Sequence, residues 1–206
     1  MDVNILLGPG LNIKRSPLCG RNFEYFSEDP YLSGKMAASY IRGIQSKGVY
    51  ACPKHLAVNS QELRRMAMDA VVDERTLREI YLTGFEIAVK EGHAKAIMSS
   101  YNQINGIYAN EDKHLLTDIL RKDWGFDGIV VTDWGGSNYH VKGVAAGSNL
   151  EMPSCGYDSA REVIAAVQNG KLREADLDER VGELVDAVME LTSEKKLSDK
   201  NFDRNA

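Results

Sequence analysis

The sequence predicts an α/β fold built on a parallel sheet, and three observations lead there. Short apolar runs alternate along the chain with segments of helical periodicity, which is the pattern of β–α units. None of these runs shows the strict in/out alternation of a half-exposed strand, so the strands are expected to be buried on both faces. Polar residues directly follow most of them, as they do where parallel strands carry a site. A (β/α) barrel and a doubly wound sheet both fit these observations.

Five segments are expected to form strands, and five to form helices. The expected strands are 3–7, 49–52, 96–98, 128–132 and 149–152. The expected helices are 31–47, 73–90, 114–122, 158–168 and 174–192. Gly48 would close the first helix, and Asp73 would cap the second. Asp176 could cap the last helix, whose apolar stripe would be Val181, Leu184, Val185 and Val188.

Composition narrows the class of protein. The chain has 206 residues, 43% of them apolar and 27% charged, which is ordinary for a globular domain. No apolar run approaches the roughly 20 residues that cross a bilayer. A net charge of −5 without a basic stripe argues against nucleic acid as a partner. The first residues lack a signal-peptide pattern, which favours a cytoplasmic location, although secretion stays open because the native start can lie upstream.

Metal and cofactor motifs are absent from the sequence. Three cysteines are present without a CxxC pair, and they are expected to be buried or partly buried free thiols: Cys19, Cys52 and Cys155. No HxH or HExxH pattern joins the histidines, and neither a GxGxxG fingerprint nor a P-loop occurs. We therefore expect no metal site and no cofactor.

Polar residues follow four consecutive predicted strands. The second strand leads into Lys54-His55, the third into Ser99–Asn102, the fourth into Asp133-Trp134 and the fifth into Glu151. Because the carboxyl ends of parallel strands share one edge, these groups are expected to meet at one rim. Polar residues after four consecutive strands are stronger evidence for a functional site than any one of these residues alone.

Asp133 and Trp134 each allow two interpretations. A carboxylate after a buried apolar run costs free energy unless it is paired or functional, but Asp133 could also cap the next helix. Trp134 offers a flat apolar face that suits a sugar ring, although large aromatic side chains usually pack in a core.

The cationic residues are similarly ambiguous. Lys54 and His55 could donate hydrogen bonds to substrate hydroxyls and keep Asp133 ionised, or they could form a solvated surface pair. Arg21 lies in a loop of about 20 residues, a length that is uncommon unless the loop is functional. It could reach the site, or it could merely pin the loop by pairing with Glu24.

Several motifs resemble glycoside hydrolase family 3, in the right order and over nearly the whole chain. These motifs are Asn12-Ile13-Lys14-Arg15, Gly20-Arg21-Asn22-Phe23-Glu24, Phe26-Ser27-Glu28-Asp29-Pro30, Pro53-Lys54-His55 with Asn59 to Glu62, Met98 to Gly106, and Val131-Thr132-Asp133-Trp134. The continuation Leu56 to Glu62 resembles the β-glucosidase-like branch rather than the β-N-acetylhexosaminidase branch.

The resemblance implies a (β/α) TIM-type barrel and a retaining, exo-acting β-glycosidase that removes β-linked sugars from the non-reducing end. It implies that Asp133 is the nucleophile. It further implies that Arg21, Lys54 and His55 bind the first sugar, that Met98 and Tyr101 line its subsite, and that Trp134 flanks the next. The expected partner is a β-linked oligosaccharide or glycoside.

The predicted barrel is incomplete. A closed barrel typically needs about 250 residues, and only five strands are predicted. Residues 1–192 are expected to be a partial barrel without its first strands, and residues 193–206 a tail or linker towards an absent α/β domain. The resemblance places the acid/base on that domain rather than in this chain. Glu62 and Glu151 are weaker local alternatives.

Two other functions remain open at this stage. The first is an aldolase-like barrel in which Lys54 forms a Schiff base with a carbonyl substrate. The second is a non-catalytic carbohydrate-binding fragment that uses Trp134 and the cationic residues.

Overall fold

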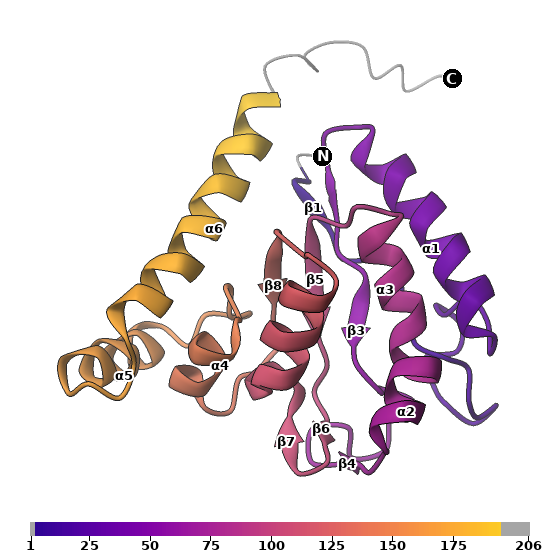
Figure 1. The fold of residues 1–206 in the computed structure, drawn as a ribbon, viewed down its shortest axis with the longest axis horizontal. Coiled ribbons are helices and arrows are strands. Elements are labelled where there is room, and N and C mark those ends of the chain that lie inside the picture. Colours follow the sequence, from indigo (N-terminus) through magenta and orange to yellow (C-terminus); the bar gives the residue numbers. More distant parts are fainter. Residues whose placement is uncertain (1–2, 195–206) are drawn as a thin grey trace.

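The computed structural model describes residues 3–194, and their arrangement is shown in Figure 1. The strands are β1 (Ile5–Leu6), β2 (Tyr50–Ala51), β3 (Lys54–Leu56), β4 (Asp69–Ala70), β5 (Ala96–Ser99), β6 (Gln103–Ile104), β7 (Ile107–Tyr108) and β8 (Ile129–Val131). The α-helices are α1 (Pro30–Gln45), α2 (Glu74–Thr76), α3 (Thr83–Lys90), α4 (His140–Ala146), α5 (Tyr157–Gln168) and α6 (Glu174–Glu194). Two π-helical segments, η1 (Leu77–Leu82) and η3 (His114–Asp123), and a 3-10 turn, η2 (Ala109–Glu111), complete the set.

The central parallel strands follow one another in chain order. β1 pairs with β2, and Gly10 forms a parallel bridge to Lys54 of β3. β3 then pairs with β5, β5 pairs with β8, and Val131 bridges to Leu150. Doubly wound sheets reverse their order at a switch point, and no reversal occurs among the described strands. The prediction of an α/β fold with parallel strands is confirmed, and the described strands do not close into a barrel.

Two strand predictions are wrong. The segment 149–152 makes one bridge and no strand. Backbone bonds join it to β8 at Leu150, whose N–H donates to Val130 and whose carbonyl accepts from Thr132. Side chains supply the flanking bonds: Asn149 Oδ1 accepts the N–H of Val130, and the N–H of Met152 donates to Thr132 Oγ1. Lys54 and His55 lie within β3 rather than beyond a strand end. Pro53 lies between β2 and β3 along the chain. Because it has no N–H to donate, it separates the two short strands.

A small sheet combines β6 and β7, from the loop that follows β5, with β4, from the segment between β3 and α2. β6 and β7 form an antiparallel hairpin, and β4 adds to β6 in parallel. The turn is Asn105-Gly106, with positive φ angles of 51° and 87°. An Asn-Gly pair between short apolar segments is a strong hairpin signal, so the sequence did carry a sign of this element.

Capping residues set the helix starts. Asp29 Oδ1 accepts the N–H of Leu32, and Pro30 occupies the first turn of α1. The predicted helix 73–90 is present as the run α2–η1–α3, and Asp73 caps it by accepting the N–H of Thr76 at 3.0 Å. The capping role predicted for Asp176 is wrong. Asp176 lies inside α6 and instead accepts a hydrogen bond from Arg173 Nε at 2.9 Å.

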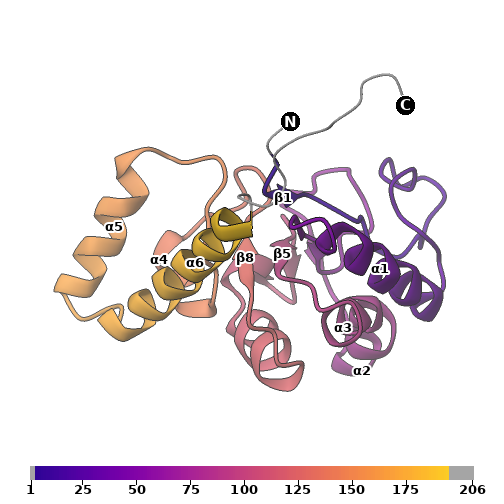
Figure 2. The ribbon, with the colours of Figure 1, turned by 90° about the horizontal axis from the view of Figure 1, so that it is seen from above.

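The strands carry apolar side chains on both faces. Ile97 and Val130 point to a core beneath α1, α3 and η3, whereas Met98, Ile129 and their neighbours point to a second cluster that Ala187 and Leu191 of α6 help to cover. Figures 1 and 2 show α1 beside α3, with α6 across the strands from them. α1 and α3 pack closely at Gly34, where an added Cβ would lie 2.7 Å from Ile87 Cδ1.

The predicted apolar stripe of α6 is wrong in part. Leu184 packs against the second cluster, but Val181, Val185 and Val188 are each about half exposed. The helix turns Arg180, Ala187 and Leu191 inward instead. α6 ends at Glu194, within the tail predicted at 193–206, and the rest of that tail lies outside the described residues. No helix in residues 3–194 is both long enough and apolar enough to cross a bilayer.

Candidate active site

Asp133 lies two residues beyond β8 and is nearly buried, with 8% of the residue exposed. Its Oδ1 accepts the N–H of Trp134 at 2.8 Å, which fixes the rotation of the carboxylate. Its Oδ2 faces His55 Nε2 at 3.5 Å and Arg21 Nη1 at 3.8 Å, and makes no hydrogen bond within the described residues. A buried carboxylate oxygen without a partner is costly, and such atoms are often found where a ligand or a reacting group belongs.

His55 is held rigidly beside that oxygen. Its peptide N–H donates to Asn12 Oδ1 at 2.7 Å, and Asn12 Nδ2 donates back to its carbonyl at 2.8 Å. The peptide bond between Lys54 and His55 is cis. The imidazole is 1% exposed, and its Nδ1 lies 3.4 Å from the hydroxyl of Tyr25.

His55 is neutral at physiological pH. Burial is the largest cause that lowers the pKa of His55, and the positive charges of Arg21, Lys54 and Arg65 lower it further, to about 2. The expectation that His55 acts as a cation beside Asp133 is therefore wrong. The alternative of a solvated surface pair is also wrong, because Lys54 and His55 are 16% and 1% exposed.

Glu24 links the two cationic side chains of the site. Its Oε1 accepts from Arg21 Nε at 2.6 Å, and its Oε2 lies 3.1 Å from Lys54 Nζ. Both interpretations of Arg21 thus hold, since it pins the loop through Glu24 and also reaches Asp133. The pairing of Glu24 with Arg21 was one of the two interpretations of the sequence, but its contact with Lys54 was missed because that contact depends on the long loop folding back over β3.

Tyr101 and Trp134 lie on the open side of Asp133. The hydroxyl of Tyr101 donates to the carbonyl of Trp134 at 2.7 Å, and Arg65 lies over the Tyr101 ring at 4.6 Å. Burial, and after it the charge of Asp133, raises the pKa of Tyr101. Trp134 is 43% exposed, so its side chain is not core and remains free to contact a ligand.

The other predicted site residues have different surroundings. Met98 is 2% exposed and packs in the second apolar cluster, so its role in lining a sugar subsite stays a prediction. Ser100 and Asn102 both donate to the carbonyl of Ala57, which ties the loop after β5 to β3. Of the two local acid/base alternatives, Glu62 pairs with Arg65 and Glu151 with His140.

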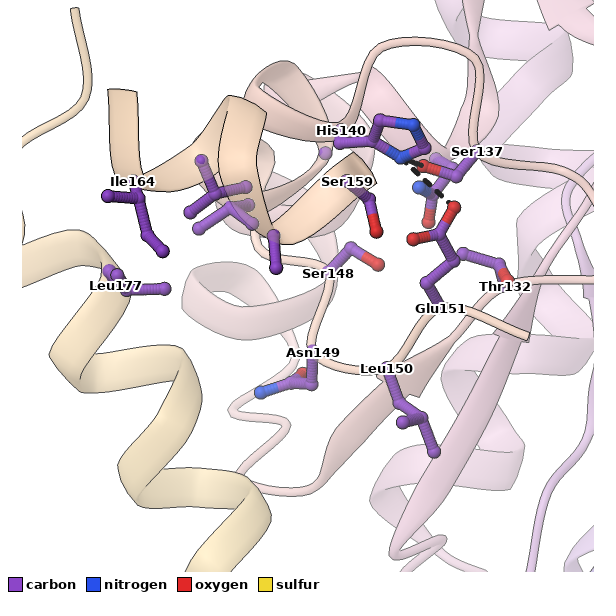
Figure 3. Close-up of a pocket in the computed structure, with 15 residues that line it drawn as sticks. Thr132, Ser137, His140, Ser148, Asn149, Leu150, Glu151, Ser159, Ile164 and Leu177 are labelled. Atoms are coloured by element: carbon purple, nitrogen blue, oxygen red, sulfur yellow. Dashed lines mark hydrogen bonds and ion pairs between the residues drawn. The ribbon is translucent and has the colours of Figure 1, made fainter. Parts of the chain in front are cut away.

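A separate cavity of about 350 Å³ lies next to this arrangement, and Figure 3 shows its lining. Thr132, Ser137, His140 and Glu151 contribute polar groups, while α5 and Leu177 supply apolar ones. Asp133 does not line this cavity. The donors around Asp133 and the cavity around Glu151 are therefore two adjacent features.

Comparison with known proteins identifies the class as glycoside hydrolases. Residues 1–187 match the description "Glycosyl hydrolase family 3 N terminal domain". The chain belongs to this family, which confirms the family predicted from the motifs.

Two curated relatives illustrate the similarity. Thermostable beta-glucosidase B of Acetivibrio thermocellus is 51% identical over 205 residues, covering 100% of this chain and 27% of the relative. An exo-alpha-(1->6)-L-arabinopyranosidase of Bifidobacterium longum is 45% identical over 204 residues, covering 99% of this chain and 27% of the relative. The chain thus spans about a quarter of the length of these relatives.

Solved structures of β-glucosidases are also similar to this chain. Beta-glucosidase 3B from Thermotoga neapolitana in complex with glucose superposes with a TM-score of 0.91 at 47% identity, covering 94% of this chain and 28% of the other. The GH3 beta-glucosidase of Bifidobacterium adolescentis gives a TM-score of 0.93 at 45% identity, covering 98% and 30%.

Proposed function

We propose that this chain is the nucleophile-bearing part of a retaining, exo-acting β-glycosidase, in which Asp133 forms a covalent glycosyl-enzyme. The observation that carries the proposal is the buried Oδ2 of Asp133, which accepts no hydrogen bond among the described residues and is faced by His55 and Arg21. The names of the relatives support a glycoside as substrate. The chain-order parallel strands support a (β/α) TIM-type barrel that further chain would complete.

The chemistry follows from this geometry. Asp133 Oδ2 forms a bond to the anomeric carbon as the bond to the leaving oxygen breaks, and that oxygen takes a proton from an acid. Water then attacks the anomeric carbon, gives its proton to the same group and frees Asp133. The hydrogen bond from Trp134 to Oδ1 keeps Oδ2 aimed at the sugar.

Three donors would hold the first sugar. Arg21 and Lys54 carry N–H groups beyond those that Glu24 occupies, and neutral His55 has one N–H to offer. Trp134 would flank the following sugar with its exposed ring. We assign the acid/base to a segment beyond this chain, since Glu62 and Glu151 are both engaged in other ion pairs.

A mechanism-based label tests the nucleophile. The full chain would be incubated with a 2-deoxy-2-fluoro-β-glucoside that carries a dinitrophenyl leaving group, and the labelled peptide mapped by mass spectrometry. Such a leaving group needs little acid catalysis, so the missing acid does not obscure the result. We expect the label on Asp133 and none in the Asp133→Asn variant. A label on another residue, or none on a folded chain, would contradict the assignment.

The same chain can be tested for the two alternative functions, the aldolase-like barrel and the carbohydrate-binding fragment. The ion pair between Lys54 Nζ and Glu24 occupies the amine that a Schiff base would need free, so the aldolase-like function is not favoured. Borohydride trapping of a carbonyl substrate on Lys54 would reinstate it. Binding of glucose without any labelling of Asp133 would instead support a non-catalytic carbohydrate-binding fragment.

A further inference from the structure

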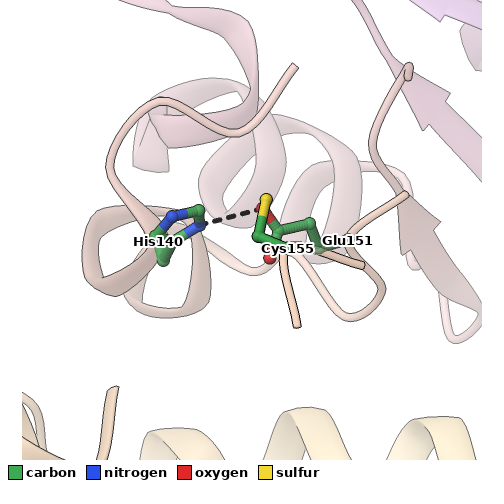
Figure 4. A group of neighbouring side chains, drawn as sticks. All are labelled: His140, Glu151 and Cys155. Atoms are coloured by element: carbon green, nitrogen blue, oxygen red, sulfur yellow. Dashed lines mark hydrogen bonds and ion pairs between the residues drawn. The ribbon is translucent and has the colours of Figure 1, made fainter. Parts of the chain in front are cut away.

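Three metal-ligand side chains converge beside the cavity of Figure 3, away from Asp133. His140 begins α4, Glu151 follows the bridge residue Leu150, and Cys155 lies in the loop before α5. His140 Nδ1 lies 3.0 Å from Glu151 Oε1, and Cys155 Sγ lies 3.3 Å from the same oxygen. All three donor atoms fall within 4.8 Å of one another, and Figure 4 shows the side chains pointing together.

We propose that His140 Nδ1, Glu151 Oε1 and Cys155 Sγ form a binding site for one thiophilic divalent cation, with Zn²⁺ as the best match. Sequence patterns do not reveal this site, since the three residues share no short metal-binding motif. Chain folding alone brings them together.

The spacing of the donors suits a tetrahedral ion. Zn²⁺ bonds of about 2.0–2.3 Å place the nitrogen and oxygen ligands about 3.4 Å apart, and the sulfur and oxygen about 3.6 Å apart. The observed separations of 3.0 and 3.3 Å are shorter by a few tenths of an ångström. Small rotations of exposed or half-buried side chains would open them, so no backbone movement is needed.

A fourth ligand and an access path are also available. Ser137 Oγ lies 3.0 Å from His140 Nδ1, and the adjoining cavity of about 350 Å³ has room for water. Cys155 is exposed, so an ion can enter from solvent, while Cys19 and Cys52 are buried. The thiol proton leaves to solvent when the sulfur coordinates the ion.

The donor set selects the class of metal. Imidazole and thiolate ligands favour zinc and similar transition ions, whereas Mg²⁺ and Ca²⁺ prefer sites made entirely of oxygen. Within residues 3–194, Glu151 forms its ion pair with His140 and none with a lysine or arginine. Its negative charge is therefore available to a cation.

Cobalt provides a direct probe. The full, reduced chain would be titrated with Co²⁺, which substitutes for Zn²⁺ and gives a sulfur-to-metal charge-transfer band when a thiolate binds. We expect one equivalent to bind, and Zn²⁺ to displace it. Cys155→Ser should abolish the band, and His140→Gln should weaken binding at least about tenfold. Asp158→Asn is the matched control, because it removes a neighbouring exposed carboxylate and leaves all three donors.

Alkylation gives a second, independent measurement. Zn²⁺ should protect Cys155 from iodoacetamide, with buried Cys19 and Cys52 unreactive throughout. The proposal is overturned if the folded chain gives no charge-transfer band. It is equally overturned if Asp158→Asn weakens binding as much as His140→Gln, since a diffuse acidic attraction would then explain the result.

Discussion

The tautomer of His55 depends on two competing neighbours of Nδ1, the hydroxyl of Tyr25 and the side-chain oxygen of Asn12. For Nε2 to donate towards Asp133 Oδ2 or a sugar, Nδ1 must be the acceptor, and the group that can donate to it is the hydroxyl of Tyr25 at 3.4 Å. Asn12 Oδ1, 3.3 Å from Nδ1, would favour the opposite tautomer. Tyr25 therefore acts as a positioning residue for the imidazole.

Tyr25→Phe should shift His55 towards the form protonated on Nδ1. The lost hydrogen bond is worth about 1 kcal/mol, enough to change the tautomer ratio roughly fivefold. Nitrogen-15 NMR of the imidazole measures the ratio directly, and Tyr81→Phe controls for the loss of a hydroxyl elsewhere. An unchanged ratio in Tyr25→Phe would show that Tyr25 does not set the tautomer and would leave Asn12 Oδ1 as the group that does.

The depressed pKa of His55 predicts acid sensitivity. The folded pKa of about 2 lies far below the ordinary 6.5, so between these values the unfolded chain binds the extra proton and the folded protein does not. Stability is present above pH 6.5 and is lost as the pH falls through this window, by up to about 1.4 kcal/mol per pH unit. Urea unfolding at several pH values should show a shallower loss in His55→Gln. His93→Gln, at an exposed histidine, should keep the original slope.

At the scale of residues, the sequence could predict candidates that stand in short motifs, but not the residues that contact them from distant parts of the chain. Lys54, His55 and Asp133 were recognisable because each stands in a short motif beside an apolar run, and Arg21 because it stands in a motif of the long loop. Glu24, Tyr25 and Asn12 contact those residues across 30 to 43 positions of chain. Such contacts depend on how the long loop folds, which no local pattern records.

At the scale of elements, one buried ion cluster joins η3, the segment after β8 and α6. Arg121 donates to Glu183, to Asn149 and to the carbonyl of Gly147, and Arg180 also pairs with Glu183. Burial lowers the pKa of Arg121 to about 10 despite the nearby carboxylate. The cluster fixes α6 through charge as well as through apolar contacts.

Glu183→Ala should therefore destabilise the chain strongly. It leaves the nearly buried guanidinium group of Arg121 without its carboxylate and Arg180 with Glu179 as its remaining acidic partner, a loss of about 3 kcal/mol by analogy with broken buried ion pairs. Chemical denaturation measures the change. Asp186→Ala, at an exposed position of the same helix, should cost less than about 0.5 kcal/mol. Equal losses in both variants would mean that the cluster contributes no more to stability than an exposed carboxylate of the same helix.

The same cluster explains why elements were easier to predict than their orientation. The helix 174–192 followed from its periodicity, but its buried face did not, because a strongly polar residue, Arg180, points inward while three valines point outward. The burial of a polar side chain such as Arg180 depends on the ion cluster with η3 and the segment after β8, which are distant in sequence. The failed strand at 149–152 has the same origin, since the side chain of Asn149 accepts the N–H of Val130 and donates to Glu183 of α6.

For the whole molecule, the outward face of α6 is an exposed apolar surface. Val181, Val185, Val188 and Met189 are each half or more exposed, and Leu6 and Leu7 at β1 are also exposed. Apolar patches of this kind in a soluble chain promote association, and the open sheet adds unpaired strand edges. The chain on its own should therefore self-associate as its concentration rises.

Replacing this surface should separate association from stability. The double variant Val185→Lys and Val188→Glu adds charge where side chains meet solvent, so the free energy of unfolding should change by less than about 1 kcal/mol. Sedimentation velocity over a range of concentrations should show less association than in the unmodified chain. Ala187→Lys, on the inward face between those positions, should instead unfold the region by burying a charge. If the double variant associates as strongly as the original, the contacts arise elsewhere, and the open edges of the parallel strands become the surface responsible.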